Sequence, residues 1–381
     1  MHFSLDAEQQ QFQDSAVRFF RERGSFERWR HDAESGAPFD RANWDRMAQF
    51  GWLSLNLPLS EGGFGASPIY TQLLMEQAGR ALSREPFVGT SVIAAHLLPH
   101  ICSPLRSKLA AAIAEGNAIV ALAFGETAAR FDLSHVQTRA EATETGFLLS
   151  GLKAYVPDGP AADWFIVPAR TSAAPRERDG ITLFLVPSGA TGLYCKNLRG
   201  ADYRQHAQLQ LESVEVHAQA VIGTVGQGLV LLESAVDHAV VAGLAEAVGI
   251  VEALRDATLQ YLKTREQFGV RIGSFQVLQH RMVDMEIACE EARAMMWYAC
   301  ASLNAPPAQR RSAVSAAKTR VGQTSLFVGH QAVQLHGGIG TTDDLIVSHY
   351  LKRLVMLESS FGNADYHRGR FLACSRLPTV A

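Results

Sequence analysis

The residues whose types and spacing could do chemistry lie in the second half of the chain, and the first group spans 261–284. Arg265 and Phe268 stand three residues apart at the end of an expected helix, so the guanidinium and the ring would share one face. This pair suits a pyrophosphate beside a nucleoside, because a guanidinium offers paired donors to phosphate oxygens. Gln276 and Gln279, one turn apart in the next helix, add amide donors. The alternative is structural, since an arginine at a helix C-terminus commonly compensates the helix dipole.

The second group is the segment 331–342, in which Gln334 precedes Gly337 and Gly338. These glycines follow an expected helix instead of a strand, which excludes the dinucleotide fingerprint of a parallel sheet. They either end the helix or let backbone N–H groups approach a phosphate closely. The motif taken alone leaves both interpretations open.

Three residues are candidates for proton transfer. Glu246 stands among alanines and valines on an apolar helix face, and a buried carboxyl group with a raised pKa can act as a base. A glutamate satisfied by a neighbouring helix is the more common outcome at such a position. His238 and His336 are candidates because imidazoles titrate near neutrality, although histidines on helices or beside glycine turns more often make structural hydrogen bonds.

The elements that must position these groups follow from the spacing of apolar residues. Helical spacing from residue 5 to about 115 predicts a helical first third, interrupted by a loop at 58–65 where proline and glycines cluster. From 119 to 222, short runs rich in β-branched and aromatic residues alternate with turn residues, which predicts an antiparallel β domain built as a sandwich or barrel. The predicted strands are 119–124, 136–142, 146–150, 164–169, 181–186, 208–211 and 220–222.

The helical pattern returns after residue 226 and predicts a bundle of four long helices at 229–268, 275–303, 310–335 and 344–372, with Gly269 as a left-handed C-terminal cap of the first. We therefore expect an α+β protein of three domains. An N-terminal helical domain (1–118) precedes a central β-barrel-like domain (119–225) and a C-terminal four-helix-bundle domain (226–381).

Composition excludes several classes of protein. The 381 residues include 35 Lys and Arg against 38 Asp and Glu, so no basic surplus supports nucleic-acid binding. The five cysteines are scattered without a Cys-x-x-Cys pair, which argues against a disulfide framework or a zinc site. Charged residues interrupt the apolar segment 229–251, and the N-terminus lacks the basic and apolar regions of a signal peptide, so we expect a cytoplasmic protein without a membrane span.

Taken in order and spacing, the two motifs resemble the acyl-CoA dehydrogenase flavoprotein family. The resemblance extends over nearly the whole chain, through the segments 57–65, 123–126 and 151–155. More narrowly, the segments 313–318, 349–353 and 361–367 resemble the small subunit of pimeloyl-CoA dehydrogenase and related heteromeric acyl-CoA dehydrogenases. The family removes two hydrogens across the Cα–Cβ bond of an acyl-CoA thioester and passes hydride to FAD, and the electrons leave to an electron-transfer flavoprotein.

The resemblance implies a site for half of the FAD. In the family, most of the contacts to each FAD come from one subunit, and the neighbouring subunit binds the ADP part of the same FAD. The matching positions here are Arg265, Phe268, Gln276, Gln334, Gly337 and Gly338. Three hydroxyl-bearing residues that commonly contact the flavin ring in the family are replaced here by Gly125, Phe131 and Pro157, and Tyr155 stands where the family has a tryptophan.

The usual catalytic carboxylates are missing as well. Phe361 and Ala239 occupy the two family positions, which leaves Glu246 as a weak candidate and the base unknown. The resemblance therefore implies one subunit of a heteromeric acyl-CoA dehydrogenase, of α2β2 form, acting in lipid or steroid catabolism. A scaffold subunit without flavin and a flavin oxidase or monooxygenase of the same fold are the alternatives. The acyl group stays open among dicarboxyl, medium-chain and steroid-derived thioesters.

Overall fold

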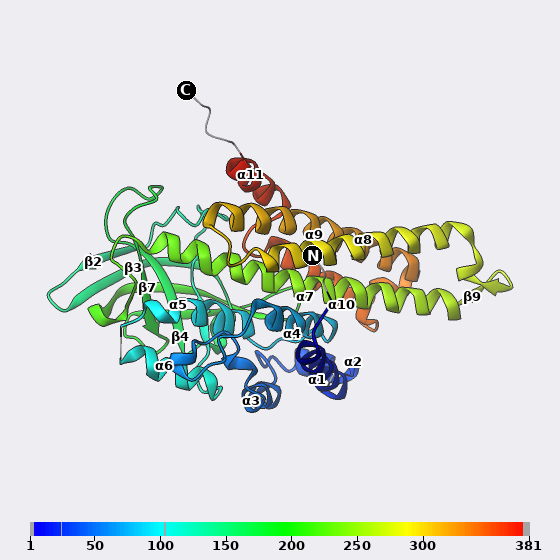
Figure 1. The fold of residues 1–381 in the computed structure, drawn as a ribbon, viewed down its shortest axis with the longest axis horizontal. Coiled ribbons are helices and arrows are strands. Elements are labelled where there is room, and N and C mark those ends of the chain that lie inside the picture. The colour runs from blue at the N-terminus through cyan, green and yellow to red at the C-terminus, as the bar shows by residue number, and fades with distance from the viewer. Residues whose placement is uncertain (1–3, 24, 103, 376–381) are drawn as a thin grey trace, which may run out of the picture. The chain divides into compact units, whose positions relative to one another are not determined.

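The computed structural model describes residues 4–23, 25–102 and 104–375. The chain folds into two compact units, each made from separate stretches of sequence (Figure 1). The bundle unit takes its described residues from Met1–Arg30, Pro68–Ser83 and Val240–Ala381. The sheet unit comprises His31–Ser67 and Arg84–Ala239.

The first third is helical, as predicted. The core side of its short helices carries apolar residues, among them Trp44, which is fully buried. The segment 58–65 is a loop with one 3₁₀ turn, Leu59–Glu61, which agrees with the prediction. The helices are α1 (Ala7–Arg23), α2 (Phe26–Glu34), α3 (Arg41–Gln49), α4 (Pro68–Arg80), the π-helix η3 (Val88–Ala94), α5 (Ala95–Leu97) and α6 (Leu105–Ala114), with 3₁₀ turns at Trp52–Ser54 and Leu98–His100.

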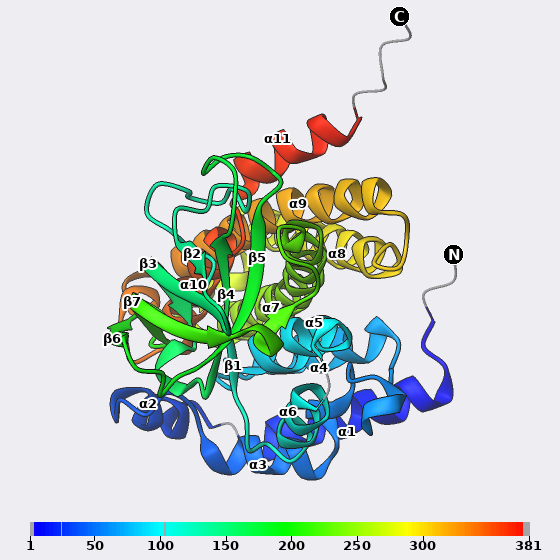
Figure 2. The ribbon, with the colours of Figure 1, turned by 90° about the vertical axis from the view of Figure 1, so that its left-hand side faces the viewer.

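The sheet unit holds one eight-stranded sheet with the order β6-β7-β3-β2-β4-β5-β8, and β1 pairs with β4 beside this path (Figure 2). Its strands are β1 (Val120–Leu122), β2 (Arg139–Ala142), β3 (Gly146–Pro157), β4 (Trp164–Arg170), β5 (Ile181–Pro187), β6 (Leu193–Arg199), β7 (Gln205–His217) and β8 (Val221–Ile222). The segment 171–179 lies in the hairpin connection between β4 and β5.

Two expectations about this sheet need correction. The pairing is not wholly antiparallel, because β1 runs parallel to β4 and β2 meets β4 in a parallel pair at Arg139 and Arg170. Strand β6 was not predicted. It is an edge strand with almost every side chain exposed, so it carries neither the continuous apolar run nor the alternation by which a strand is recognised.

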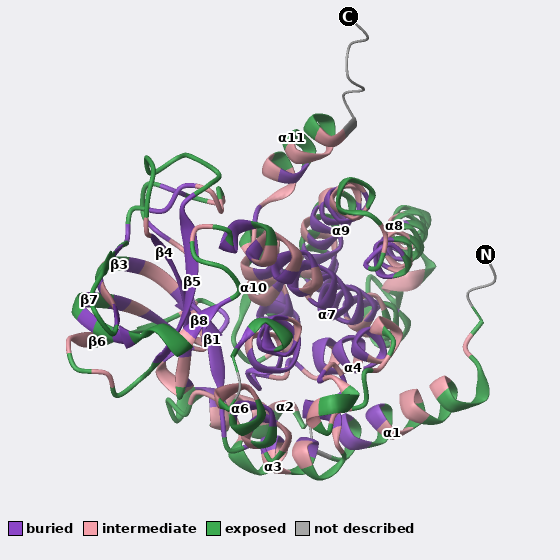
Figure 3. Cartoon of the chain, turned by 60° about the vertical axis from the view of Figure 1, so that its left-hand side comes forward, coloured by how far each residue is buried: buried purple, intermediate pink, exposed green. Residues whose placement is uncertain are grey.

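Four long helices do follow the sheet: α7 (Gly228–Thr264), α8 (Gln276–Ala301), α9 (Pro307–His336) and α10 (Ile346–Ser359). The predicted fourth helix is wrong in extent, because a separate helix, α11 (Ala364–Ser375), carries its last part. The break lies at Phe361 and Gly362, whose φ angles of 56° and 113° leave the helical region. In Figure 3 the inner faces of α7 and α9 are buried and the outer faces of α8 and α9 are exposed.

Helix α7 is the one helix within the described residues that is long and apolar enough to cross a membrane by composition. However, 67% of its most apolar stretch is buried inside the fold, so this apolar surface belongs to the core. Two glycines let α4 and α7 cross closely in the bundle unit. A Cβ on Gly79 would lie 2.1 Å from the carbonyl oxygen of Glu246, and one on Gly249 would lie 2.0 Å from that of Glu76.

Candidate functional site: one end of the helical bundle

Arg265 and Phe268 lie in a hairpin and not on a helix, which corrects the sequence-based expectation. Helix α7 ends at Thr264, and β9 (Glu266–Gln267) pairs with β10 (Val270–Arg271). The two residues between these strands, Phe268 and Gly269, have φ angles of 56° and 79°, which the tight primed turns of hairpins require. Phe268 is 92% exposed, so a phenylalanine is held in a left-handed backbone conformation with its ring in solvent. Gly269 is left-handed as expected, but it belongs to this turn.

The end of α9 presents open backbone. Gln334 is exposed, and the helix ends at His336, as the sequence predicted. Gly337 has φ 69° and ψ −147°, a conformation essentially restricted to glycine. A Cβ added to Gly337 or Gly338 would meet no atom within 4 Å, so the backbone at both positions can be approached closely. This geometry allows a group such as a phosphate to approach the backbone, and it is also the geometry of a glycine that ends a helix.

The hairpin and the end of α9 lie at the same end of the bundle. The rings of Tyr261, in the last turn of α7, and His336 stack with their centroids 4.5 Å apart. Gln276 is the first residue of α8, which leaves from the hairpin, as Figure 1 shows for α8 beside β9. The stacked rings therefore place the ends of α7 and α9 together, and the six residues taken from the family motif come from the three segments at this end of the bundle. A guanidinium, two amides, an aromatic ring and open glycine backbone suit the pyrophosphate and nucleoside of an ADP group.

The ring-side positions lie in the sheet unit. Gly125 and Tyr155 form an antiparallel bridge, and the Ala154 N–H donates to the Gly125 carbonyl at 2.7 Å. A Cβ at Gly125 would lie 3.0 Å from the Tyr155 carbonyl oxygen, so a threonine there would be crowded. The Tyr155 ring packs against His206 with centroids 4.6 Å apart. These positions offer no side-chain hydroxyl for a flavin ring apart from the phenol, which lies 3.4 Å from His206 Nε2.

Neither family position for the base carries a proton acceptor in its side chain. Phe361 occupies the strained turn between α10 and α11, and Ala239 is buried in α7. A buried polar network supports the turn. His367 Nε2–H donates to the Phe361 carbonyl at 3.1 Å, and the same imidazole lies 3.3 Å from Ser315 through Nδ1. The backbone of this turn is therefore fixed although its side chain has no acid or base chemistry.

Glu246 has a structural partner. Its two carboxylate oxygens accept from Arg353 of α10, at 2.7 Å from Nε and 2.9 Å from Nη2. The Glu246 side chain is only 2% exposed. The interpretation as a glutamate satisfied by a neighbouring helix is confirmed, and its assignment as a base stays a hypothesis that this pairing does not favour.

Both histidine candidates make backbone hydrogen bonds, as expected for structural imidazoles. His238 Nδ1 lies 2.9 Å from the Ser234 carbonyl and His336 Nδ1 lies 2.8 Å from the Ala332 carbonyl, each one turn earlier in the same helix. Burial also lowers the pKa of His336, which keeps it neutral at physiological pH.

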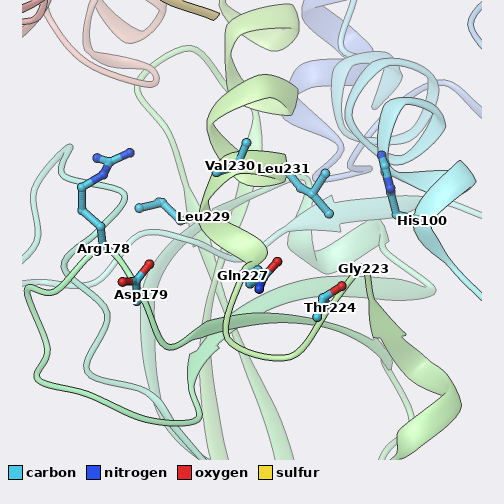
Figure 4. A pocket seen from close by; sticks show the side chains of 9 residues that line it. All are labelled: His100, Arg178, Asp179, Gly223, Thr224, Gln227, Leu229, Val230 and Leu231. Atoms are coloured by element: carbon cyan, nitrogen blue, oxygen red, sulfur yellow. The ribbon is translucent and has the colours of Figure 1, made fainter.

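The sheet unit contains a cleft of about 510 Å³ around the start of α7 (Figure 4). Arg178 and Asp179 come from the β4–β5 hairpin tip, and His100 lies on the other side of the helix. Arg178 also forms an ion pair with Glu233 of α7 at 2.8 Å. The remaining lining residues are Gly223, Thr224, Gln227, Leu229, Val230 and Leu231. Sequence reasoning missed this cleft because its walls come from three distant segments, none of which carries a motif.

The buried imidazole of His367 makes the stability of the bundle unit dependent on acid. Burial, together with the charges of Lys318 and Arg370, lowers the pKa of His367 to about 3. The unfolded chain takes up this proton near pH 6.5, so the free energy of unfolding falls by up to about 1.4 kcal/mol per pH unit as the pH drops below 6.5. We expect urea midpoints to fall between pH 7 and pH 5. His367→Gln should reduce this dependence, whereas the exposed His31→Gln should not, and equal slopes in all three proteins would contradict the assignment.

Comparison with known proteins identifies the class of protein that this fold and site define. The chain matches the N-terminal domain of acyl-CoA dehydrogenases over residues 6–116, their middle domain over 121–214 and their C-terminal domain over 226–373. It therefore belongs to the acyl-CoA dehydrogenase family. The members of this family are oxidoreductases that act on CH–CH groups. The predicted fold, with helical, β and helical domains in this order, is confirmed.

The chain is also similar to individual members of this family and to solved structures. The chain is 28% identical to a mitochondrial isovaleryl-CoA dehydrogenase of Solanum tuberosum over 96% of its own length and 89% of the relative's. It resembles the ChsE4-ChsE5 complex of Mycobacterium tuberculosis with a TM-score of 0.87 and 27% identity, covering 98% of this chain and 99% of that one. A variant of the Tcur3481-Tcur3483 steroid ACAD has a TM-score of 0.85 and 27% identity, covering 96% and 97%.

Proposed function

We propose that this chain is one subunit of a heteromeric FAD-dependent acyl-CoA dehydrogenase that converts a CoA thioester to the 2-enoyl-CoA. The observation that carries the proposal is an asymmetry between two halves of the site. The residues that suit an ADP group are present and exposed at one end of the bundle, whereas Phe361 and Ala239 replace both carboxylates. A division of labour between two related chains would leave this pattern, and two structural neighbours are complexes of two differently named chains.

On this proposal the chain contributes binding instead of proton transfer. When bound, FAD supplies hydride acceptance, and the protein's part is to hold and orient it. Arg265 would bind the pyrophosphate with a charge-assisted hydrogen bond, Gln276 and Gln334 would add amide donors, and Gly337 and Gly338 would admit the phosphate to the backbone. Phe268 would pack against the nucleoside. The flavin ring and the reacting Cα–Cβ bond of the substrate would lie against the partner's residues.

We further propose that the cleft around the start of α7 binds part of the CoA thioester. The guanidinium of Arg178 and the polar groups of Thr224 and Gln227 line one region of it, and Leu229 and Leu231 provide apolar surface. Such a mixture of a few polar groups with apolar walls is typical of small-molecule sites. The proposal also includes a homologous subunit in an α2β2 assembly and an electron-transfer flavoprotein as electron acceptor. It places the protein in the cytoplasm, with a role in lipid or steroid catabolism.

The test is the flavin content of the complex formed on co-expression with a homologous acyl-CoA dehydrogenase chain. We expect Arg265→Ala to lower FAD affinity about ten- to a hundredfold, because a charge-assisted hydrogen bond contributes about 1.5–3 kcal/mol. The complex should still assemble, as gel filtration would show. Flavin absorbance per complex, measured against total FAD in a titration, gives the affinity.

Matched variants make this test specific. Arg368→Ala removes an exposed arginine from α11 and should leave the flavin unchanged. Tyr155→Ala and Phe361→Ala should also change flavin content little, since they would line a vacant ring site. If these two strip the flavin and Arg265→Ala does not, the chain holds its own FAD and the shared-site model is wrong. A complex that is colourless throughout would instead support the scaffold subunit.

A further inference from the structure

The β4–β5 loop, residues 171–180, supplies one wall of the cleft around the start of α7. Arg178 and Asp179 line the cleft from this loop (Figure 4). Residues 172–179 are all exposed, so the loop has no apolar core of its own. A segment with few buried apolar contacts opens at little cost in free energy. The conformation of this wall therefore depends on polar contacts.

A single buried guanidinium makes these contacts. Arg170 is the last residue of β4, and only 7% of it is exposed. Its Nη1 donates to the carbonyl oxygens of Glu177 at 2.9 Å and Asp179 at 2.6 Å. Its Nη2 donates to those of Ser134 at 2.8 Å and Pro175 at 2.9 Å. The side chain therefore ties the β4–β5 loop to the segment that precedes β2.

These hydrogen bonds fix the backbone of Arg178 from both sides. Glu177 and Asp179 are its neighbours in sequence, and both of their carbonyl groups accept from the same nitrogen of Arg170. The far end of the Arg178 side chain is held as well, because its Nη2 lies 2.8 and 3.0 Å from the two carboxylate oxygens of Glu233 on α7. Arg178 is thus oriented at both ends before a ligand arrives.

A guanidinium is suited to this task. Its planar fork offers five donors in fixed directions, whereas the ammonium of a lysine is a compact group at one point. Burying a charged side chain costs free energy unless it is hydrogen-bonded. Three of the four acceptors of Arg170 belong to the β4–β5 loop, so opening the loop would leave a buried charge without most of its partners. Arg170 therefore favours the closed arrangement of the loop.

The base of the loop is joined to the segment that precedes α7. The Gly180 N–H donates to the Gly226 carbonyl at 2.8 Å, and the Gly226 N–H donates to the Thr182 hydroxyl at 2.8 Å. Gly180 has a φ of 86°, and a Cβ there would lie 2.1 Å from the Ser172 carbonyl oxygen, so this position requires glycine. With the base fixed in this way, the contacts of Arg170 determine where the outer part of the loop lies.

We propose that Arg170 is a positioning residue of the cleft, which holds the β4–β5 loop so that Arg178 and Asp179 form a wall that binds the CoA part of the substrate. This inference rests on the proposed function, because it takes the cleft as a site for a CoA thioester. It assigns this wall to CoA instead of the acyl group, since both side chains are charged. When only a fraction of the molecules holds the loop in place, the apparent affinity falls in proportion to that fraction.

Two measurements on the protein as isolated, with any subunit that co-purifies, test this proposal. Amide hydrogen exchange over 171–180 reports on the loop and should become about tenfold faster or more in Arg170→Met. Calorimetric titration with free CoA reports on the cleft, and the same variant should bind CoA about ten- to a hundredfold more weakly. Arg170→Lys should show smaller changes in the same directions, and it replaces Arg170→Met if that variant does not fold.

A double-mutant cycle distinguishes positioning from a general loss of structure. If Arg170 acts through the wall, Arg170→Met should weaken CoA binding little further once Arg178→Ala and Asp179→Ala have removed the two wall groups. With the homologous subunit present, KM for a thioester should rise while kcat stays unchanged, because the wall binds substrate without touching the reacting atoms. Arg176→Met makes the same replacement at an exposed position of the loop and should change neither exchange nor affinity.

The outcomes separate this inference from the proposed function. Unchanged exchange in Arg170→Met and Arg170→Lys would show that Arg170 does not hold the loop, and the proposed function would stand. Faster exchange with unchanged CoA affinity would mean that the loop is not part of the binding wall, which also overturns the inference. Equal losses of affinity with and without the two wall groups would overturn it as well. If the wild-type protein binds neither CoA nor a thioester, the proposed function and the positioning role fail together.

Discussion

The purified chain alone is expected to oxidise acyl-CoA thioesters about a hundred- to ten-thousandfold more slowly than the same chain in complex with a homologous subunit. A positioned general base contributes a factor of this size. Neither Phe361 nor Ala239 can abstract the α-proton, and the carboxylate of Glu246 is held by both sides of the Arg353 guanidinium. Turnover should be measured with an artificial electron acceptor and added FAD, so that a missing acceptor protein does not hide activity.

The same assay shows what would contradict this expectation. Robust turnover by the single chain, left intact by Glu246→Gln, would mean that another residue acts as base. Turnover that consumes O₂ without any electron acceptor would point to the oxidase or monooxygenase alternative. Adding the homologous subunit provides the control, since it should restore the rate without any change in this chain.

Phe361→Glu alone should not restore activity to the single chain. A carboxylate accelerates the reaction only when it lies within hydrogen-bond reach of the α-proton while thioester and flavin are both in place. The ring-side positions Gly125 and Tyr155 pair with each other in an antiparallel β-bridge, and the Tyr155 ring packs against His206. The variant is assayed beside the wild-type chain with the same acceptor. A rescued single chain would show that the flavin-ring pocket is functional here.

The order of structural classes along this chain could be predicted from its sequence because it depends on local periodicity. Helices α8 and α9 begin and end within a few residues of the predicted bounds, since long apolar stripes specify them. The break between α10 and α11 could not be predicted in this way. Phe361 adopts a positive φ because His367 and its neighbours hold the turn, and such tertiary contacts leave no trace in the pattern of apolar residues.

The site residues that belong to a sequence motif could be predicted, whereas those brought together only by tertiary packing could not. Arg265, Phe268 and Gly337 were found from their spacing, although the hairpin that carries the first two was mistaken for the end of a helix. The stacked rings of Tyr261 and His336, which bring these segments together, depend on the antiparallel path of the helices. Likewise Arg170 joins the carbonyl groups of Ser134 and Pro175, which lie in two loops without a recognisable motif.

Glu246→Gln should lower the free energy of unfolding by about 3–5 kcal/mol, which is the usual cost of removing one partner of a buried ion pair. The Arg353 side chain is only 12% exposed, so its charge would be left without the bidentate carboxylate and with little water to replace it. Urea denaturation of the purified chain measures the change. Activity of the complex should fall only as far as the folded fraction does, because on the proposed function Glu246 does not transfer a proton.

A double-mutant cycle separates this structural role from the catalytic hypothesis. Glu246→Leu combined with Arg353→Met replaces the pair with apolar side chains of similar size, and buried ion pairs replaced in this way often cost little or nothing. We expect the double variant to be more stable than either single variant, since the two side chains are directly coupled. It should also retain the activity of the complex. If Glu246→Gln instead abolishes turnover while the unfolding curve stays unchanged, Glu246 is the base after all, and its contact with Arg353 then serves to orient a catalytic carboxylate instead of holding α7 to α10.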